Sequence, residues 1–206
     1  MKKVTCGCGR WHKGTCPVLK KWSFEAGGDS PGEWFMKALF LRDAALRFDI
    51  YDEAHKFKED QWPDLGFLGS VNLMLVAFSF EALLKAVMIM NGHRATERGV
   101  IANAFRDHDM DNLLRLADPN KTLLDREERK FLKNLQKSSW RGRYPIPTRE
   151  RDIDYSPMGG DEHRLTETLW LKLRTHIIEK GWMIKGKDRM WMKDLSKPWS
   201  PKLLKA

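Results

Sequence analysis

The sequence has few cysteines and lacks the short motifs of the common enzyme classes. Only three cysteines occur among 206 residues, and no apolar signal segment follows the basic start Met1-Lys2-Lys3. We therefore expect a cytoplasmic protein, whose thiols stay reduced or bind metal rather than form disulfides. The motifs G-x4-G-K-[ST], G-x-G-x2-G, H-E-x2-H and G-x-S-x-G do not occur. Their absence argues against P-loop, dinucleotide-binding, zinc-protease and serine-hydrolase chemistry.

Strand patterns are nearly absent, whereas apolar residues recur at steps of three and four in several segments. Gly/Pro-rich turns and capping residues separate these segments. We predict helices over residues 33–59, 64–92, 97–105, 109–117, 125–138 and 161–180. Apart from a proline-containing loop at 140–158, the connections are short. The sequence therefore predicts an all-α fold, an antiparallel up-and-down helical bundle.

The stretch from Asp64 to Gly92 is apolar nearly all round, so we expect it to be the core helix of this bundle. Asp64 is the expected N-cap, and Gly92 suits a left-handed C-terminal cap. The stretch is long enough to cross a bilayer. However, Glu81 and Lys85 would be costly in a membrane, and their spacing of four residues supports a helix in water. We therefore expect no membrane partner.

Positive charge is concentrated at the two ends of the chain. Residues 1–22 and 180–206 each carry a net charge of +6, which leaves −3 for the remainder out of a total of +9. Basic ends favour a polyanionic partner, although they would also keep a Trp-rich chain soluble. We divide the chain into a basic Cys-rich leader, a Gly/Pro/Ser-rich linker, the helical bundle and a basic aromatic tail that fits a short hairpin, at 1–22, 23–32, 33–180 and 181–206.

The leader contains a set of metal-ligating residues in the pattern C-x-C-x3-H-x3-C, formed by Cys6, Cys8, His12 and Cys16. Three thiolates and one imidazole are a tetrahedral donor set of the kind that zinc uses in structural sites. The alternative is a flexible leader with incidental thiols. Because no carboxylate lies nearby to act as a base, we expect a structural zinc and no cofactor for catalysis.

Two places carry residues suited to RNA or nucleotide chemistry. Trp140, Arg141, Arg143 and Tyr144 combine guanidinium groups with aromatic rings, which suits phosphate binding and base stacking. The alternative is a structural turn whose arginines pair with acidic residues. His108 lies between two aspartates that could orient an imidazole, although a histidine at a helix start more often caps or packs. Arg141, Arg143 and His108 are therefore the candidates for catalysis.

Three stretches resemble the HEPN superfamily (higher eukaryotes and prokaryotes nucleotide-binding). They are the segment FSFEALLKAVMIMNG, the helix start at His108-Asp109 with Leu113, and the helix that ends in WRGRYP. Members of this superfamily often show a Glu/Leu-Lys-rich second helix, a "GH-D-L"-like helix start and an Arg-Tyr-Pro segment. The resemblance covers about residues 33–180. It implies an antiparallel helical bundle that usually forms a homodimer.

Many HEPN proteins are metal-independent ribonucleases of toxin–antitoxin and phage-defence systems, and others bind RNA or nucleotides without catalysis. Catalytic members carry Arg-x4-6-His, a spacing that no histidine here satisfies. The nearest pair is Arg47 and His55, which are separated by seven residues. The resemblance therefore implies a non-catalytic RNA- or nucleotide-binding protein, in a bacterial or phage defence or toxin–antitoxin type of system. Two alternatives stay open: a divergent endoribonuclease that uses Arg141 or Arg143 with a histidine, and a protein-interaction adaptor.

Overall fold

The computed structural model describes residues 24–54, 65–141 and 160–181. These residues are mostly helical, which confirms the all-α class. The chain divides into two units, Met1–Pro157 and Met158–Ala206. The described part of the first unit holds the helices α2 to α6 and one short hairpin, and that of the second holds α7 (Gly160–Gly181). Leu169, Leu173 and Ile177 recur at steps of four along α7, which predicts one apolar face, and all three are buried.

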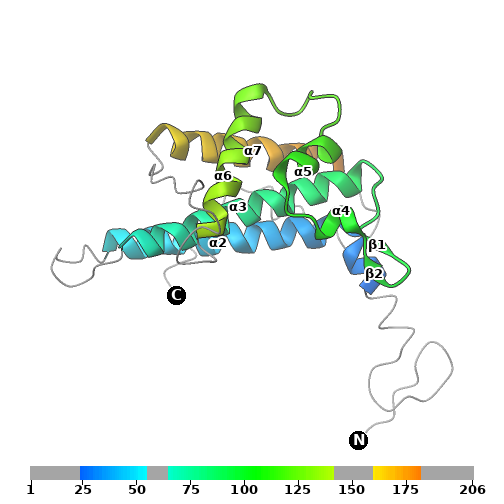
Figure 1. Ribbon diagram of the computed structural model, residues 1–206, viewed down its shortest axis with the longest axis horizontal. Coiled ribbons are helices and arrows are strands. Elements are labelled where there is room, and N and C mark those ends of the chain that lie inside the picture. Colours follow the sequence, from blue (N-terminus) through cyan, green and yellow to red (C-terminus); the bar gives the residue numbers. More distant parts are fainter. Residues whose placement is uncertain (1–23, 55–64, 142–159, 182–206) are drawn as a thin grey trace, which may run out of the picture. The chain divides into compact units, whose positions relative to one another are not determined.

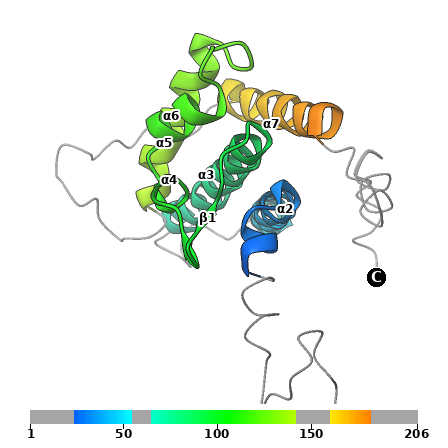
Figure 2. The same ribbon diagram turned by 90° about the vertical axis from the view of Figure 1, so that its right-hand side faces the viewer.

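The helix α3 (Leu65–Met90) is the core of the first unit, as its composition predicts. It packs against α2 (Pro31–Ala54), α5 (Met110–Ala117) and α6 (Arg126–Arg141). Figure 2 shows α3 between α2 on one side and α5 and α6 on the other, and Figure 1 shows α2 and α3 running side by side in opposite directions. By length and composition its window Val71–Met90 would also suit a membrane span, and 61% of that window is buried in the structure.

The C-terminus of α3 forms the predicted left-handed cap. Gly92 has a φ of +92°, and the His93 N–H donates to the carbonyl of Met88 at 3.1 Å. This bond closes the last turn of the helix. The side chain of Asn91 then donates to the Ala117 carbonyl at 2.7 Å, which ties the end of α3 to the end of α5.

The apolar periodicity of α2 predicts Leu39 and Leu46 on its core face and Arg42 on its solvent side, but in the structure this helix turns a different face to the core. Its buried stripe includes Phe35, Ala38 and Ala45, and it also includes Arg42, which we had expected on the solvent side. Only 5% of the Arg42 surface is exposed. Leu39 and Leu46 are only partly buried.

Residues 97–105 do not form the predicted helix. Instead, β1 (Thr96–Glu97) pairs antiparallel with β2 (Val100–Ile101), and a short helix α4 (Asn103–Arg106) follows. The two residues between the strands, Arg98 and Gly99, have φ values of +50° and +79°. Positive φ at both central positions is what a two-residue type I′ hairpin turn requires.

The predicted linker at 23–32 is structured where it is described. Residues 24–28 are helical, and α2 begins at Pro31, a residue suited to the first turn of a helix. The Asp29 carboxylate accepts hydrogen bonds from the Thr96 N–H and Oγ1 at 2.8 and 3.0 Å. Gly28 lies so close to Thr96 that a Cβ there would come within 2.3 Å of the threonine methyl group. The segment therefore docks on the hairpin.

The spacing of Asp125 and Glu128 predicts a capping box at the start of α6, and the structure confirms it. The Asp125 side chain accepts from the Glu128 N–H, and the Glu128 side chain accepts from the Asp125 N–H, both at 2.8 Å. The preceding loop is held by Asp118, whose buried carboxylate accepts from the N–H groups of three successive residues and pairs with Arg129. These residues are Thr122, Leu123 and Leu124. One carboxylate thus fixes the connection between α5 and α6.

Candidate functional site

A charged cluster lies on the otherwise apolar α3, where this helix meets the start of α5. We call it the Lys85 cluster, and it consists of Glu81, Lys85, Asp107 and His108. The Lys85 ammonium donates to Glu81 Oε1 at 2.7 Å, and only 2% of the Lys85 side chain is exposed. Burying an ammonium group is costly unless a carboxylate compensates its charge. Glu81, which lies one helical turn before Lys85, is therefore needed to keep this cation inside the core.

Aromatic rings cover the lysine side of the cluster. The Lys85 ammonium lies 5.4 Å from the centre of the Trp34 ring, within the range of a cation–π interaction. The Trp34 ring packs against Phe105, with ring centres 5.9 Å apart, and its Nε1 donates to the Gly28 carbonyl at 2.9 Å. Trp34 thus links α2, the segment before it and α4 around a single buried ammonium group.

His108 lies at the open side of the cluster. Its Nδ1 is 2.9 Å from Glu81 Oε2, its ring packs near that of Phe78, and 48% of its side chain is exposed. Because an ionised carboxylate only accepts hydrogen bonds, Nδ1 carries the proton in this contact. In the neutral ring Nε2 is then the acceptor. A carboxylate that fixes the tautomer in this way is a common support for functional histidines.

Asp107 and Asp109 position the start of α5 rather than the imidazole. The Asp107 carboxylate accepts from the Asp109 N–H at 2.9 Å and from the Asn112 side chain at 2.8 Å, and Asp109 caps the helix at Asp111. The hydrogen bond from the Asp109 N–H lowers the pKa of Asp107. Burial by itself would raise this pKa, but the Asn112 side chain and the charge of Lys85 lower it further. The predicted orienting role of these aspartates is therefore wrong, since Glu81 orients His108.

Gln136 of α6 is a residue that sequence reasoning missed. Its side-chain amide donates to the carbonyl of His108, and its Oε1 accepts from the Met110 N–H at 3.0 Å. These two bonds fix the backbone on both sides of Asp109 and hold His108 at the start of α5. A glutamine in a Lys-rich helix gives no local signal of this role, because its partners are about 26–28 residues away in the chain.

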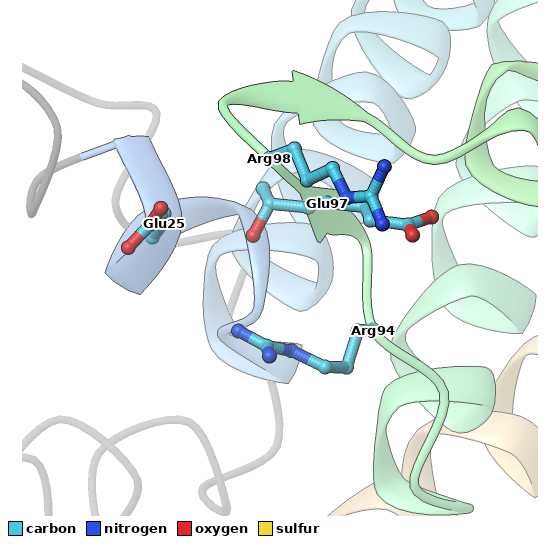
Figure 3. Close-up of a pocket in the computed structure, with 5 residues that line it drawn as sticks. Glu25, Arg94, Glu97 and Arg98 are labelled. Atoms are coloured by element: carbon cyan, nitrogen blue, oxygen red, sulfur yellow. The ribbon is translucent and has the colours of Figure 1, made fainter.

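A separate pocket of about 470 Å³ lies between the helical residues 24–28 and the hairpin. Figure 3 shows Glu25 on one side of it, with Arg94, Glu97 and Arg98 from the hairpin region on the other. Thr96 also lines this pocket. Arg94 is held by the Asp29 carboxylate at 3.2 Å. The described lining of this pocket includes none of the residues that the sequence predicts for RNA, nucleotide or metal binding.

The remaining predicted site residues lie mostly outside the described residues. Arg143, Tyr144 and the metal-ligand set Cys6, Cys8, His12 and Cys16 fall there, as does the tail hairpin. Trp140 and Arg141 are the last two residues of α6, which extends slightly further than the sequence predicts. Within the ranges that the structure describes, no group of three or more His, Cys, Asp or Glu side chains could hold a metal ion.

Comparison with known proteins adds no relative: no family model matches the chain, and neither a curated protein nor a solved structure matches it.

Proposed function

We propose that this chain is a HEPN-like helical bundle that binds RNA or a nucleotide without catalysis of its own. The observation that carries the proposal is the 2.9 Å contact between Glu81 and His108. Two of the three stretches that resemble HEPN proteins meet in this contact, one from the middle of α3 and one from the start of α5. Two short sequence stretches that resemble the same superfamily support the proposal more strongly when residues from both stretches contact each other.

The proposal that the chain has no catalysis of its own rests on the chemistry that RNA cleavage needs. A metal-independent ribonuclease requires a base for the 2′-hydroxyl and an accessible cation for the charge that develops on the phosphate. In the Lys85 cluster the cation is Lys85, whose ammonium group is buried and already paired with Glu81. The chain also lacks the Arg-x4-6-His spacing. We therefore propose binding through Trp140, Arg141, Arg143 and Tyr144, assisted by the basic ends.

By the same resemblance we propose a homodimer that works in a bacterial or phage defence or toxin–antitoxin type of system. The expected location is the cytoplasm, where RNA and nucleotides are present.

Incubation of the purified protein with total RNA is expected to retard the RNA in a native gel and to leave it intact in a denaturing gel. Binding through phosphate contacts should weaken steeply as salt rises, because counterions are released from the RNA. Arg143→Ala should weaken the retardation. The matched control is Arg47→Ala, which removes an exposed arginine that pairs with Asp43 on α2. A protein that leaves RNA neither retarded nor cut would favour the adaptor alternative instead.

A divergent ribonuclease is the second candidate, and the pairing of His108 with Glu81 favours it. With Nδ1 held by the carboxylate, Nε2 of the half-exposed ring has the arrangement of a general base. Arg141 or Arg143 would then supply the cation. RNA cleavage that disappears in both His108→Ala and Arg143→Ala, while retardation persists, would establish this function and overturn the non-catalytic proposal.

We also propose that Cys6, Cys8, His12 and Cys16 hold one structural zinc ion. Metal analysis of the purified chain is expected to find zinc in a one-to-one ratio, and Cys6→Ser is expected to lose it, because a tetrahedral site needs all four ligands. Thermal unfolding of the same samples gives a second readout, since metal binding contributes to folding. Equal zinc content and equal stability in the variant would contradict the proposal.

A further inference from the structure

The helix α6 carries a stripe of basic residues along its exposed side. We call it the α6 ridge, and it consists of Arg126, Lys130, Lys133 and Lys137, which are all exposed. Their spacing of four, three and four residues places them within an arc of roughly 60° on the helix surface, at 3.6 residues per turn. The ridge extends over about 16 Å, at a rise of 1.5 Å per residue.

The ridge points away from the core. Among the described side chains of α6, the buried ones are Glu128, Phe131, Leu132 and Leu135, which lie on the opposite side of the same helix. The basic residue of this helix that serves the fold is Arg129, which pairs with the buried Asp118 and lies outside the ridge. The four ridge side chains are therefore not needed to hold α6 against α3.

Most of the ridge charge has no ion-pair partner within the part of the chain that the structure describes. Lys133 pairs with Asp111 of α5. Among the described residues, Arg126, Lys130 and Lys137 have no ion-pair partner. Like charges three and four residues apart destabilise a helix. The stripe thus weakens α6 by itself and leaves these charges available to a partner of opposite charge.

The ridge is also exceptional within its own region of the chain. Residues 23–179 have a net charge of −3, whereas α6 alone has six basic and two acidic residues, a net charge of +4. The rest of this region therefore carries −7. Within this acidic region, the basic face of α6 attracts a polyanion, whereas the rest of the region repels it.

We propose that the α6 ridge is a contact surface for the phosphate backbone of RNA, an inference that rests on the proposed RNA-binding function. The occupant is RNA because a regular row of cations, about 6 Å apart along the axis, matches a linear polyanion. The exposed ridge offers no aromatic ring for base stacking. Contacts of this kind position a nucleic acid without reading its bases, so the ridge binds RNA of any sequence.

The test uses the full chain, in which Arg126, Lys130 and Lys137 are all replaced by glutamine. The matched control replaces Arg47, Arg98 and Arg106 by glutamine, an equal loss of charge on exposed residues outside the ridge. Fluorescence anisotropy measures the affinity for a labelled oligouridine and for a mixed-sequence RNA of equal length, over a range of salt concentrations. Thermal unfolding is recorded for all three proteins.

The ridge variant should bind both RNAs more weakly than the control, by the same factor for each. Its slope of log affinity against log salt should fall by about 2, at about 0.7 per lost contact with a single strand. Its thermal midpoint should equal or exceed that of the wild type, because repulsion within α6 is relieved. Weaker binding without loss of stability identifies a contact surface rather than a structural element.

Other results overturn the proposal in distinguishable ways. Equal affinity and equal slope in the ridge variant and the control would show that the ridge does not contact RNA, while the chain still binds RNA elsewhere. A wild-type protein that does not bind RNA would overturn both the ridge proposal and the proposed function. Binding to phosphatidylserine-containing vesicles that is lost in the ridge variant, with RNA binding unchanged, would assign the ridge to a membrane surface instead.

Discussion

Replacement of Asp118 by alanine is expected to lower the free energy of unfolding by about 3–5 kcal/mol, the range for breaking a buried ion pair by removing one partner. The variant leaves the guanidinium of Arg129 without its carboxylate and leaves three N–H groups of the loop before α6 without their acceptor. Urea unfolding of the two proteins measures the loss.

The matched control for Asp118 is Asp111→Ala on the same unit. Asp111 pairs with Lys133 at the surface, where both side chains are largely exposed. Exposed pairs contribute at most about 1 kcal/mol. If Asp118→Ala destabilised the protein no more than Asp111→Ala does, the loop would not depend on this carboxylate.

The stability that Asp118 supplies should also depend on pH. Burial alone would raise its pKa, but hydrogen bonds from Leu123, Leu124 and Thr122 and the charge of Arg129 outweigh burial and lower the pKa. A carboxyl group with a lowered pKa in the folded state stabilises the fold above its unfolded pKa of about 3.9. This contribution is lost as the pH falls through the folded pKa. Below about pH 4, the wild type should therefore lose stability more steeply than Asp118→Ala.

Glu81→Ala is the other substitution with a large expected effect, again about 3–5 kcal/mol of unfolding free energy. It removes the carboxylate that compensates the buried ammonium of Lys85 and also the acceptor for His108. Chemical denaturation provides the measurement.

A double variant separates the charge from the packing in this cluster. Glu81→Leu combined with Lys85→Met replaces the buried ion pair by apolar side chains of similar size. Such exchanges are often neutral or stabilising, so the double variant should recover most of the stability that Glu81→Ala loses. A double variant as unstable as Glu81→Ala would mean that the cluster contributes through its shape, including the contact of Lys85 with Trp34.

The elements that the sequence predicts well are those fixed by local signals. The apolar stretch of α3, its Gly92 cap, the start of α5 near Asp109 and the capping box of α6 all depend on residues a few positions apart. Local patterns of this kind are visible without any knowledge of the fold. His108 was found in the same way, from its position at a predicted helix start.

The parts that the sequence predicts poorly depend on distant partners. The segment around Asp29 reads as a linker because the residue that orders it, Thr96, is 67 positions away. Gln136 and the burial of Arg42 give no local signal either. The hairpin was missed because Arg98-Gly99 is a weaker turn signal than Asn-Gly, although it adopts the same positive φ values.

The central position of α3 has a consequence for how the first unit can come apart. Of the larger packing interfaces between its helices, only that of α5 with α6 does not include α3. The helix α2 and the pair α5–α6 therefore both pack mainly against α3 (Figure 2). Neither can leave without exposing one flank of the most apolar helix of the chain. Such an arrangement favours loss of the whole unit in one cooperative step over the stepwise detachment of subdomains.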